Sequence, residues 1–199
     1  MKQSESVYRM AIDAIHAGMR AIDADSIRDG MVWYRNAQRE SIHAFNAAGL
    51  TYPDPVVLGC VSACSPRTPW HRNVATAIRA CMHRNGYMMI GIQKCMQIVA
   101  CDGSVDTVAS ILLGKRKDAW KTHAFFRNLS GDLDRYVTID GHMQWILSGE
   151  WMQGYRQSIG DNGKQSPNAS SYQMMSQALI DASVCYGMRP AQLQACLWV

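Results

Sequence analysis

The sequence predicts an all-α fold, a bundle of about ten helices joined by short loops, and three observations indicate it. Apolar residues recur at intervals of three and four along most of the chain, as they do on the buried face of an amphipathic helix. Capping residues precede many of these stretches, and glycine or proline follows several of them. The one strand-like stretch, 88–92, is apolar and short, but it lies inside a longer helical pattern over 87–100.

The first two helices are expected to form a scaffold hairpin. A serine near the N-terminus can cap the first helix, whose apolar stripe covers 7–19, and an Asp-Ser pair begins the second, over 25–49. Pro55 then suits the first position of a short buried helix over 56–61, because the N–H that proline lacks would be unpaired there in any case.

The middle helices are bounded by capping and breaking residues. Thr68 can cap and Pro69 can open a helix that ends at the Arg-Asn-Gly turn of 84–86. Ser104 similarly precedes an apolar helical pattern over 105–113. These signals are local, so they predict where helices begin and end without predicting what the helices pack against.

The C-terminal part is predicted to be helical as well. Asp140 follows an apolar run and begins a new helical pattern, and a polar loop covers 160–171. A last pair of helices, 172–185 and 191–199, is separated by a glycine and by Pro190, which cannot continue a helix.

Length and composition favour one domain. The 199 residues contain 48% hydrophobic residues, enough for a sizeable core, and we predict a single domain over 1–199. Within it we expect the scaffold hairpin at 1–50, a core at 55–150, and C-terminal helices at 170–199 that pack back. The net charge of +4 is mild. The clustering of Lys and Arg at 115–127 therefore says more about possible partners than the net charge of the whole chain does.

Cysteine usage and hydropathy give expectations about metal sites, localisation and membrane contact. Seven cysteines form no C-x-x-C pair and sit mostly among apolar residues, where a free Cys behaves as a small hydrophobe. We therefore expect no metal site and no cofactor. Because the N-terminus lacks an apolar signal region and no run reaches membrane-spanning length, we expect a cytoplasmic protein, in the host cytoplasm if the source is viral, without membrane contact. We also expect a monomer.

The stretch 111–146 combines features that suit an anionic polymer. It contains a basic cluster with one acid, Asp118, followed by a Gly-Asp loop and by Asp140. At a helix N-terminus the helix dipole favours a charged carboxylate, so Asp140 is expected to be ionised and fixed. A carboxylate beside bound phosphates suits chemistry that passes through a developing cation.

These residues resemble the helix-hairpin-helix DNA glycosylases of the endonuclease III type. Leu113-Gly114 is similar to the start of that family's hairpin, Lys121-Thr122 to its Lys-Thr pair, and Ile139-Asp140-Gly141-His142 to its Val-Asp-Thr-His element. The segment 61–75 is similar to the family segment whose loop fills the gap left by an extruded base. The second glycine of the family hairpin is absent, since Gly114 is followed by Lys115-Arg116-Lys117.

The resemblance implies a glycosylase-like bundle with a groove for a flipped nucleotide, a Schiff-base lysine at Lys121 and an essential aspartate at Asp140. His142 would bind phosphate or orient Asp140. Apolar neighbours and other cations both favour the neutral form of an amine, which is the form that attacks. The ordinary alternatives are a phosphate-binding or surface lysine, a plain helix N-cap at Asp140 and a satisfied structural histidine at His142. Trp70 could likewise be only a packing anchor. The residues expected to contact double-stranded DNA are Ser65, Arg67, Trp70, Arg72, Asn73, Lys115, Arg116, Lys117, Thr122 and Arg127.

Three functions remain open at this point. The leading hypothesis is an enzyme that everts and releases one damaged or modified base in DNA, as a glycosylase or lyase does. The second is a DNA-modifying transferase, since some virus-associated families that resemble glycosylases are implicated in thymine hypermodification. Such an enzyme joins an amino acid or amine to an activated, pyrophosphorylated 5-hydroxymethyl pyrimidine. The third is a DNA-binding module without catalysis.

Overall fold

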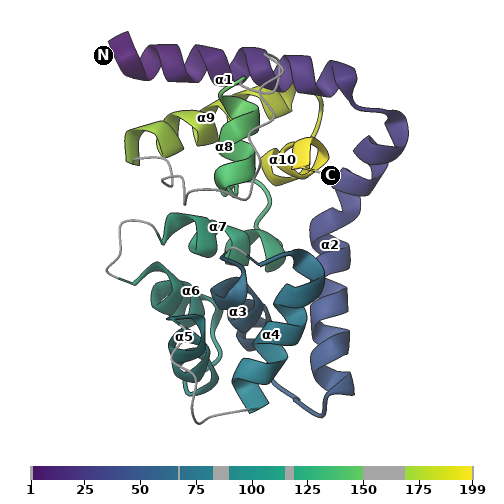
Figure 1. The fold of residues 1–199 in the computed structure, drawn as a ribbon, viewed down its shortest axis with the longest axis vertical. Coiled ribbons are helices and arrows are strands. Elements are labelled where there is room, and N and C mark those ends of the chain that lie inside the picture. Colours follow the sequence, from purple (N-terminus) through teal and green to yellow (C-terminus); the bar gives the residue numbers. More distant parts are fainter. Residues whose placement is uncertain (1, 67, 83–89, 115–118, 150–168, 199) are drawn as a thin grey trace. The chain divides into compact units, whose positions relative to one another are not determined.

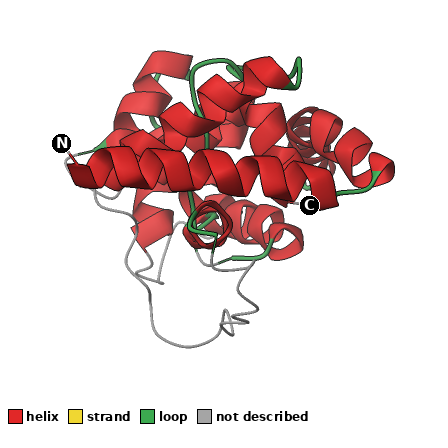
Figure 2. Ribbon diagram, turned by 90° about the horizontal axis from the view of Figure 1, so that it is seen from above, coloured by secondary structure: helices red, strands yellow, loops and turns green. Residues whose placement is uncertain are grey.

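The computed structural model describes residues 2–66, 68–82, 90–114, 119–149 and 169–198. In these ranges the fold is all-α, with ten helices and no strand, which confirms the predicted fold class (Figures 1 and 2). The described part of the strand-like stretch 88–92 belongs to a helix. The helices are α1 (Lys2–Ala21), α2 (Ala24–Ala47), α3 (Asp54–Cys64), α4 (Trp70–Met82), α5 (Ile90–Val99), α6 (Val105–Leu113), α7 (Trp120–Leu129), α8 (Gly141–Leu147), α9 (Ala169–Cys185) and α10 (Pro190–Trp198).

The chain divides into two compact units. Unit 1 comprises Met1–Tyr34 and Asp132–Val199, and unit 2 comprises Arg35–Gly131. The division falls inside α2 and after α7, whereas the sequence predicts a single domain whose core covers 55–150. None of the helices in the described ranges is both long enough and apolar enough to cross a membrane.

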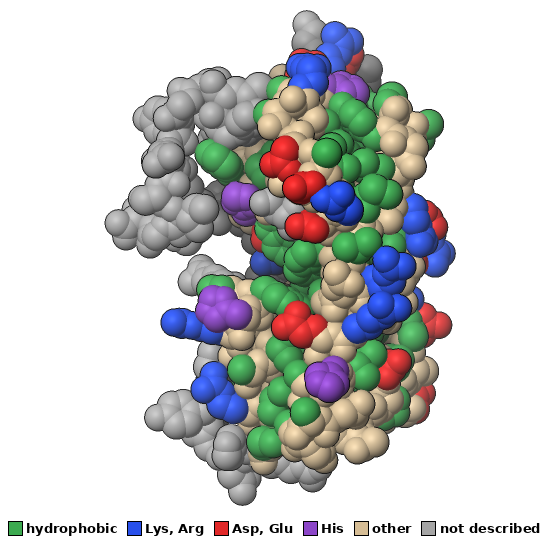
Figure 3. Space-filling view, turned by 90° about the vertical axis from the view of Figure 1, so that its right-hand side faces the viewer, with side chains coloured by type: hydrophobic (Ala, Val, Ile, Leu, Met, Phe, Trp, Pro, Cys, Tyr) green, Lys and Arg blue, Asp and Glu red, His purple; other side chains and the backbone are tan. Residues whose placement is uncertain are grey.

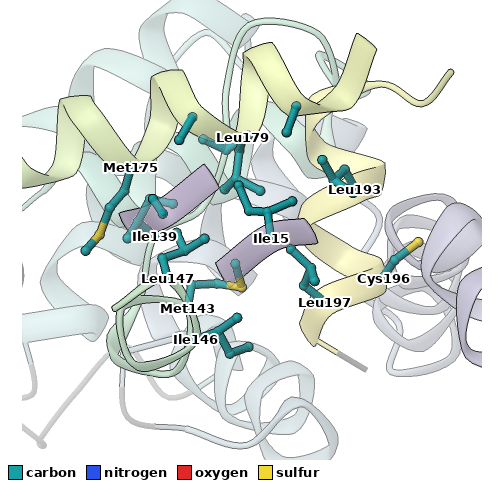
Figure 4. Close-up of a cluster of buried hydrophobic side chains, with 14 of the residues drawn as sticks. Ile15, Ile139, Met143, Ile146, Leu147, Met175, Leu179, Leu193, Cys196 and Leu197 are labelled. Atoms are coloured by element: carbon teal, nitrogen blue, oxygen red, sulfur yellow. The ribbon is translucent and has the colours of Figure 1, made fainter. Parts of the chain in front are cut away.

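Unit 1 is built around α1, α8, α9 and α10, which pack against one another. Their apolar faces form one buried cluster in which Ile15, Met143, Leu179 and Leu193 are fully covered (Figure 4). Full burial of such a side chain contributes about 1.5–3 kcal/mol each. Because the N-terminal helix and the C-terminal helices share this core, the two ends of the chain stabilise each other.

Unit 2 is organised around α3, which packs against α4, α5, α6 and α7. Residues 56–64 are all buried, as expected for a helix that is apolar on every side. The predicted buried helix at 56–61 is therefore confirmed, and it extends further in both directions. Pro55 lies in its first turn, behind an N-cap at Pro53.

Two predicted helix starts can be compared with the structure. Ser104 is the N-cap of α6, because its hydroxyl accepts a hydrogen bond from the Thr107 N–H at 3.2 Å, and the predicted range 105–113 is confirmed. The fourth helix begins one residue later than predicted. The Pro69 carbonyl accepts from two N–H groups of the first turn, while the Thr68 hydroxyl donates to Pro66 O at 3.2 Å. The turn at 84–86 and the loop residues 160–168 lie outside the described residues.

Candidate functional site

The predicted site residues are distributed over both units. Lys121 and the segment 65–73 belong to unit 2, and Asp140 and His142 belong to unit 1. Arg67, Lys115, Arg116 and Lys117 lie outside the described residues.

In unit 2, Trp70, one of the expected DNA contacts, connects the start of α4 to two other helices. It is the first residue of α4, and its indole Nε1 donates to Glu40 Oε2 of α2 at 2.9 Å. Its ring packs edge-on against Phe125 of α7, with centroids 6.4 Å apart and an interplanar angle of 82°. This geometry is favourable for aromatic pairs, so Trp70 is a packing anchor that fixes the start of α4 against α7.

Lys121 lies in the first turn of α7 and is half-buried. Phe125 follows it one helical turn later, so the two side chains share a face of the helix. Because Trp70 contacts Phe125, the structure brings the segment 65–73 beside the α7 face that carries Lys121. Two of the stretches singled out in the sequence therefore lie together in unit 2, although they are far apart in the chain.

The other predicted residues of segment 65–73 differ in exposure. Arg72 is exposed, whereas Asn73 is buried with 1% of its surface accessible. Within the described part of the chain, Asn73 Oδ1 has no hydrogen-bond partner. Ser65 caps the C-terminus of α3, and its hydroxyl donates to Ser62 O at 2.9 Å. Of the two α4 residues Arg72 and Asn73, Arg72 is therefore the one that is accessible to solvent.

Two of the expected DNA contacts, Thr122 and Arg127, lie on α7, and neither side chain is freely exposed. Thr122 is buried. The Arg127 guanidinium forms an ion pair with Asp106 of α6 at 3.1 Å, and its side chain is only 19% exposed. Burial first, and then the charge of Arg127, lower the pKa of His123 below its usual value. Arg127 therefore ties α7 to α6.

Lys94 is a residue that the sequence pattern did not single out. Its Nζ donates to the Leu112 carbonyl at 2.6 Å, near the end of α6. A cation is favourable at a helix C-terminus, where carbonyls lack intrahelical partners. Nothing in the local sequence of α5 indicates this contact, because it joins two separate helices.

In unit 1, Asp140 is the N-cap of α8, as predicted. Its Oδ1 accepts from the Met143 N–H at 2.9 Å, and its backbone oxygen accepts from Gln144 N at 2.8 Å. The carboxylate is half-buried. His142 lies in the first turn of α8, where its ring packs against Trp145 with centroids 5.8 Å apart.

The segment that leads to Asp140 is held by polar side chains that are buried or half-buried. The Tyr172 hydroxyl donates to Val137 O at 2.9 Å. The Tyr34 hydroxyl lies 2.7 Å from Gln194 Oε1 and 3.3 Å from Thr138 Oγ1. We call these side chains, from α2, α9 and α10, the clamp.

The clamp was not predicted, because its tyrosines occur within apolar stripes that indicate only core positions. Burial raises the pKa of Tyr172, and the charge of Asp140 contributes in the same direction. A tyrosine within an apolar stripe indicates a hydroxyl that needs a hydrogen-bond partner in the core, because a buried tyrosine hydroxyl usually has one. The sequence does not indicate which residue that partner is. The clamp fixes the position from which Asp140 projects.

Four cysteines of unit 2 lie in the core. Cys60, Cys64, Cys81 and Cys95 are buried and unbridged, and the sulfurs of Cys64 and Cys95 are 3.7 Å apart. A hydrogen bond with Cys81 and burial raise the pKa of Cys60, and hydrogen bonds with three neighbouring thiols and burial raise that of Cys95. Within the described ranges, no three His, Cys, Asp or Glu side chains gather as a metal site requires.

The fold and these positions define an all-helical protein with a half-buried lysine in one unit and a helix-capping aspartate in the other. A family model matches residues 1–199, and the chain belongs to that family, DUF7178, which is described as a family of unknown function. Neither the curated proteins nor the solved structures provide a match to the chain.

Proposed function

We propose that the protein binds double-stranded DNA and acts on a single everted, damaged or modified base, as a helix-hairpin-helix glycosylase or lyase does. The observation that carries this proposal is the placement of Asp140, which caps α8 at the end of a backbone segment held by the clamp. Electrostatic catalysis requires a charge that is fixed before the reaction begins, and a rigid N-cap carboxylate meets this requirement.

Asp140 and Lys121 have different roles in the proposed reaction. Breaking an N-glycosidic bond builds positive charge at the sugar, which the Asp140 carboxylate stabilises. The Lys121 amine attacks C1′, so a C–N bond to lysine forms while the bond to the base breaks. The electron pair leaves with the base, which takes up a proton, and the lysine nitrogen loses one. Extruding the base costs a few kcal/mol, least for an abnormal base.

The segment 65–73 supports DNA binding independently of the chemistry. Trp70 holds this segment beside the Lys121 face of α7, and Arg72 is exposed at the start of α4. A cation in the first turn of a helix, next to backbone N–H groups without intrahelical partners, is suited to a phosphate oxygen.

Borohydride trapping tests the proposal. The protein is incubated with duplexes that contain uracil, oxidised pyrimidines or 5-hydroxymethyl pyrimidines, and a covalent adduct is expected with one of them. Lys121→Ala should abolish the adduct. Lys121→Arg keeps the charge but not the nucleophilic amine, so it should bind DNA and form no adduct. An adduct that persists in both variants would remove Lys121 from the mechanism.

A second candidate is a DNA base transferase, and the hairpin sequence favours it. Gly114 ends α6 with a positive φ of 53°, but the second glycine of the family hairpin is replaced by the basic run 115–117. Side chains would then hold the phosphates of an activated base where the family uses backbone N–H groups. A gain in base mass on pyrophosphorylated 5-hydroxymethyl DNA supplied with amino acids identifies this activity, and no gain excludes it for these substrates.

A further inference from the structure

The outer face of α2 in unit 2 carries a row of basic side chains. Arg35, Arg39 and His43 follow one another at intervals of four residues, and all three are exposed. Residues at this spacing lie on the same face of a helix, so they form one stripe, which we call the α2 stripe. With a rise of about 1.5 Å per residue, the three positions span about 12 Å.

The two arginines of the α2 stripe differ from the arginines of unit 1 in their partners. Among the described residues, neither Arg35 nor Arg39 forms an ion pair, whereas four arginines of unit 1 do; these pairs are Arg9–Glu5, Arg28–Asp25, Arg135–Asp132 and Arg189–Asp134. Like charges four residues apart destabilise a helix. The spacing of Arg35 and Arg39 therefore costs the helix a small amount of stability, and their exposure leaves both side chains accessible to a partner.

The acid closest to the stripe in sequence is already engaged. Glu40 accepts the hydrogen bond from the Trp70 indole, which fixes the start of α4 against this part of α2. The α2 stripe is thereby continuous with the segment 65–73, the part of unit 2 assigned to DNA above. Figure 3 views the molecule from the side that faces right in Figure 1, where Lys and Arg side chains stand at the surface among acidic and apolar ones.

We propose that the α2 stripe binds the phosphate backbone of double-stranded DNA and extends the DNA-contacting surface of unit 2 beyond the loop. The inference rests on the proposed function only in taking DNA as the partner. Successive arginines rise about 6 Å along the helix, a step that lets each one reach a different phosphate. Contacts of this kind position the protein and do not read sequence.

The test is the salt dependence of binding to a duplex without a substrate base. Each phosphate contact contributes about 0.9 to the slope of the logarithm of the affinity against the logarithm of the salt concentration. Arg35→Ala combined with Arg39→Ala should therefore make the slope shallower by about 1.8. Arg35→Lys with Arg39→Lys should restore most of it, because lysine keeps the charge.

The matched control is Arg9→Ala combined with Arg28→Ala. It removes the same net charge from two exposed arginines that already have carboxylate partners, with side chains 75% and 70% exposed. The control should leave the slope unchanged, and circular dichroism should show that both double variants remain helical.

Each outcome separates this inference from the proposed function. If wild-type protein binds DNA and the stripe variant keeps its slope, the inference is wrong while the proposed function stands. If the slope becomes shallower by the same amount in the stripe variant and the control variant, the change reflects only the lower net charge of the protein, and the inference is again wrong. If wild-type protein does not bind duplex DNA at all, both fail, and binding to an acidic protein would be the remaining role for the stripe.

Discussion

The hydroxyl of Tyr172 in α9 donates to the backbone oxygen of Val137 at 2.9 Å, shortly before Asp140. This bond joins a C-terminal helix to the segment that positions the candidate catalytic carboxylate. The Tyr34 hydroxyl contacts Thr138 Oγ1 of the same segment at 3.3 Å and Gln194 Oε1 at 2.7 Å. Since Val137, Thr138 and Ile139 are all buried, the segment has no water to replace these bonds if they are lost.

Tyr172→Phe should therefore lower the stability of the protein. Removing the hydroxyl leaves Val137 O without its partner in a buried segment, at a cost of about 1–3 kcal/mol in the free energy of unfolding. Chemical denaturation measures this loss. Tyr8→Phe is the control, because the Tyr8 hydroxyl binds Asp181 at an exposed site, and its loss should change stability by less than about 0.5 kcal/mol. Equal losses in the two variants would contradict the clamp.

Substitution of Asp140 can separate its capping role from its charge. Asparagine caps a helix nearly as well as aspartate, so Asp140→Asn should change the free energy of unfolding by less than about 0.5 kcal/mol. Asp140→Ala should cost about 1 kcal/mol, because the Met143 N–H loses its acceptor. If the carboxylate stabilises a sugar cation, both variants should lose base release in a single-turnover assay. Full activity in Asp140→Asn would leave only the capping role.

The features that the sequence predicted well are those set by neighbouring residues. The bounds of α6 and its N-cap at Ser104 follow from a hydroxyl followed by an apolar period, and the cap at Asp140 follows from the same logic. Both signals act within a few residues. For this reason the positions of the helices could be predicted without knowledge of their packing.

The features that it did not predict depend on residues far apart in the chain. The Tyr34 hydroxyl contacts the Gln194 side chain, although 160 positions separate the two residues in the sequence. Trp70 similarly contacts Glu40 through a hydrogen bond and Phe125 through its ring. The division into units falls inside α2, where the helical pattern continues without a break. Nothing in an uninterrupted helix indicates that its two halves belong to different packing units.

Gly30 provides a test of the packing in unit 1. A Cβ at this position would lie 2.4 Å from Cys196 Cα and 2.6 Å from Cys196 N, and neither backbone atom can move aside without shifting α10. In a helix interior Gly→Ala usually stabilises by about 1 kcal/mol. Here the sign should reverse, with Gly30→Ala losing about 1–3 kcal/mol of the free energy of unfolding. Thermal or chemical denaturation measures the change.

Gly141→Ala is the matched control for Gly30→Ala. Gly141 is also helical, and a Cβ added there would meet nothing within 4 Å. The control should be neutral or slightly stabilising. If both alanine variants gained stability, the close approach of α2 and α10 at Gly30 would not exist in solution.

The buried thiols of unit 2 predict a loss of stability at alkaline pH. Neighbouring thiols and burial raise the pKa values of Cys60 and Cys95, so both remain protonated in the folded state. In the unfolded chain a thiol ionises near pH 9. Above that pH the folded state binds more protons than the unfolded state, so the free energy of unfolding falls as the pH rises. The slope should approach about 1.4 kcal/mol per pH unit for each thiol.

Denaturation series from pH 7 to about pH 10, under reducing conditions, measure this slope. Cys95→Ala should lower stability throughout by opening a small cavity, but its alkaline slope should be shallower because one buried thiol no longer contributes. Cys185 is exposed, so Cys185→Ala should keep the wild-type slope. Tyr172, whose pKa burial also raises, adds to the loss only above about pH 10, where an unfolded tyrosine ionises. Identical slopes in Cys95→Ala and wild type would show that the thiols of this core do not control the alkaline transition.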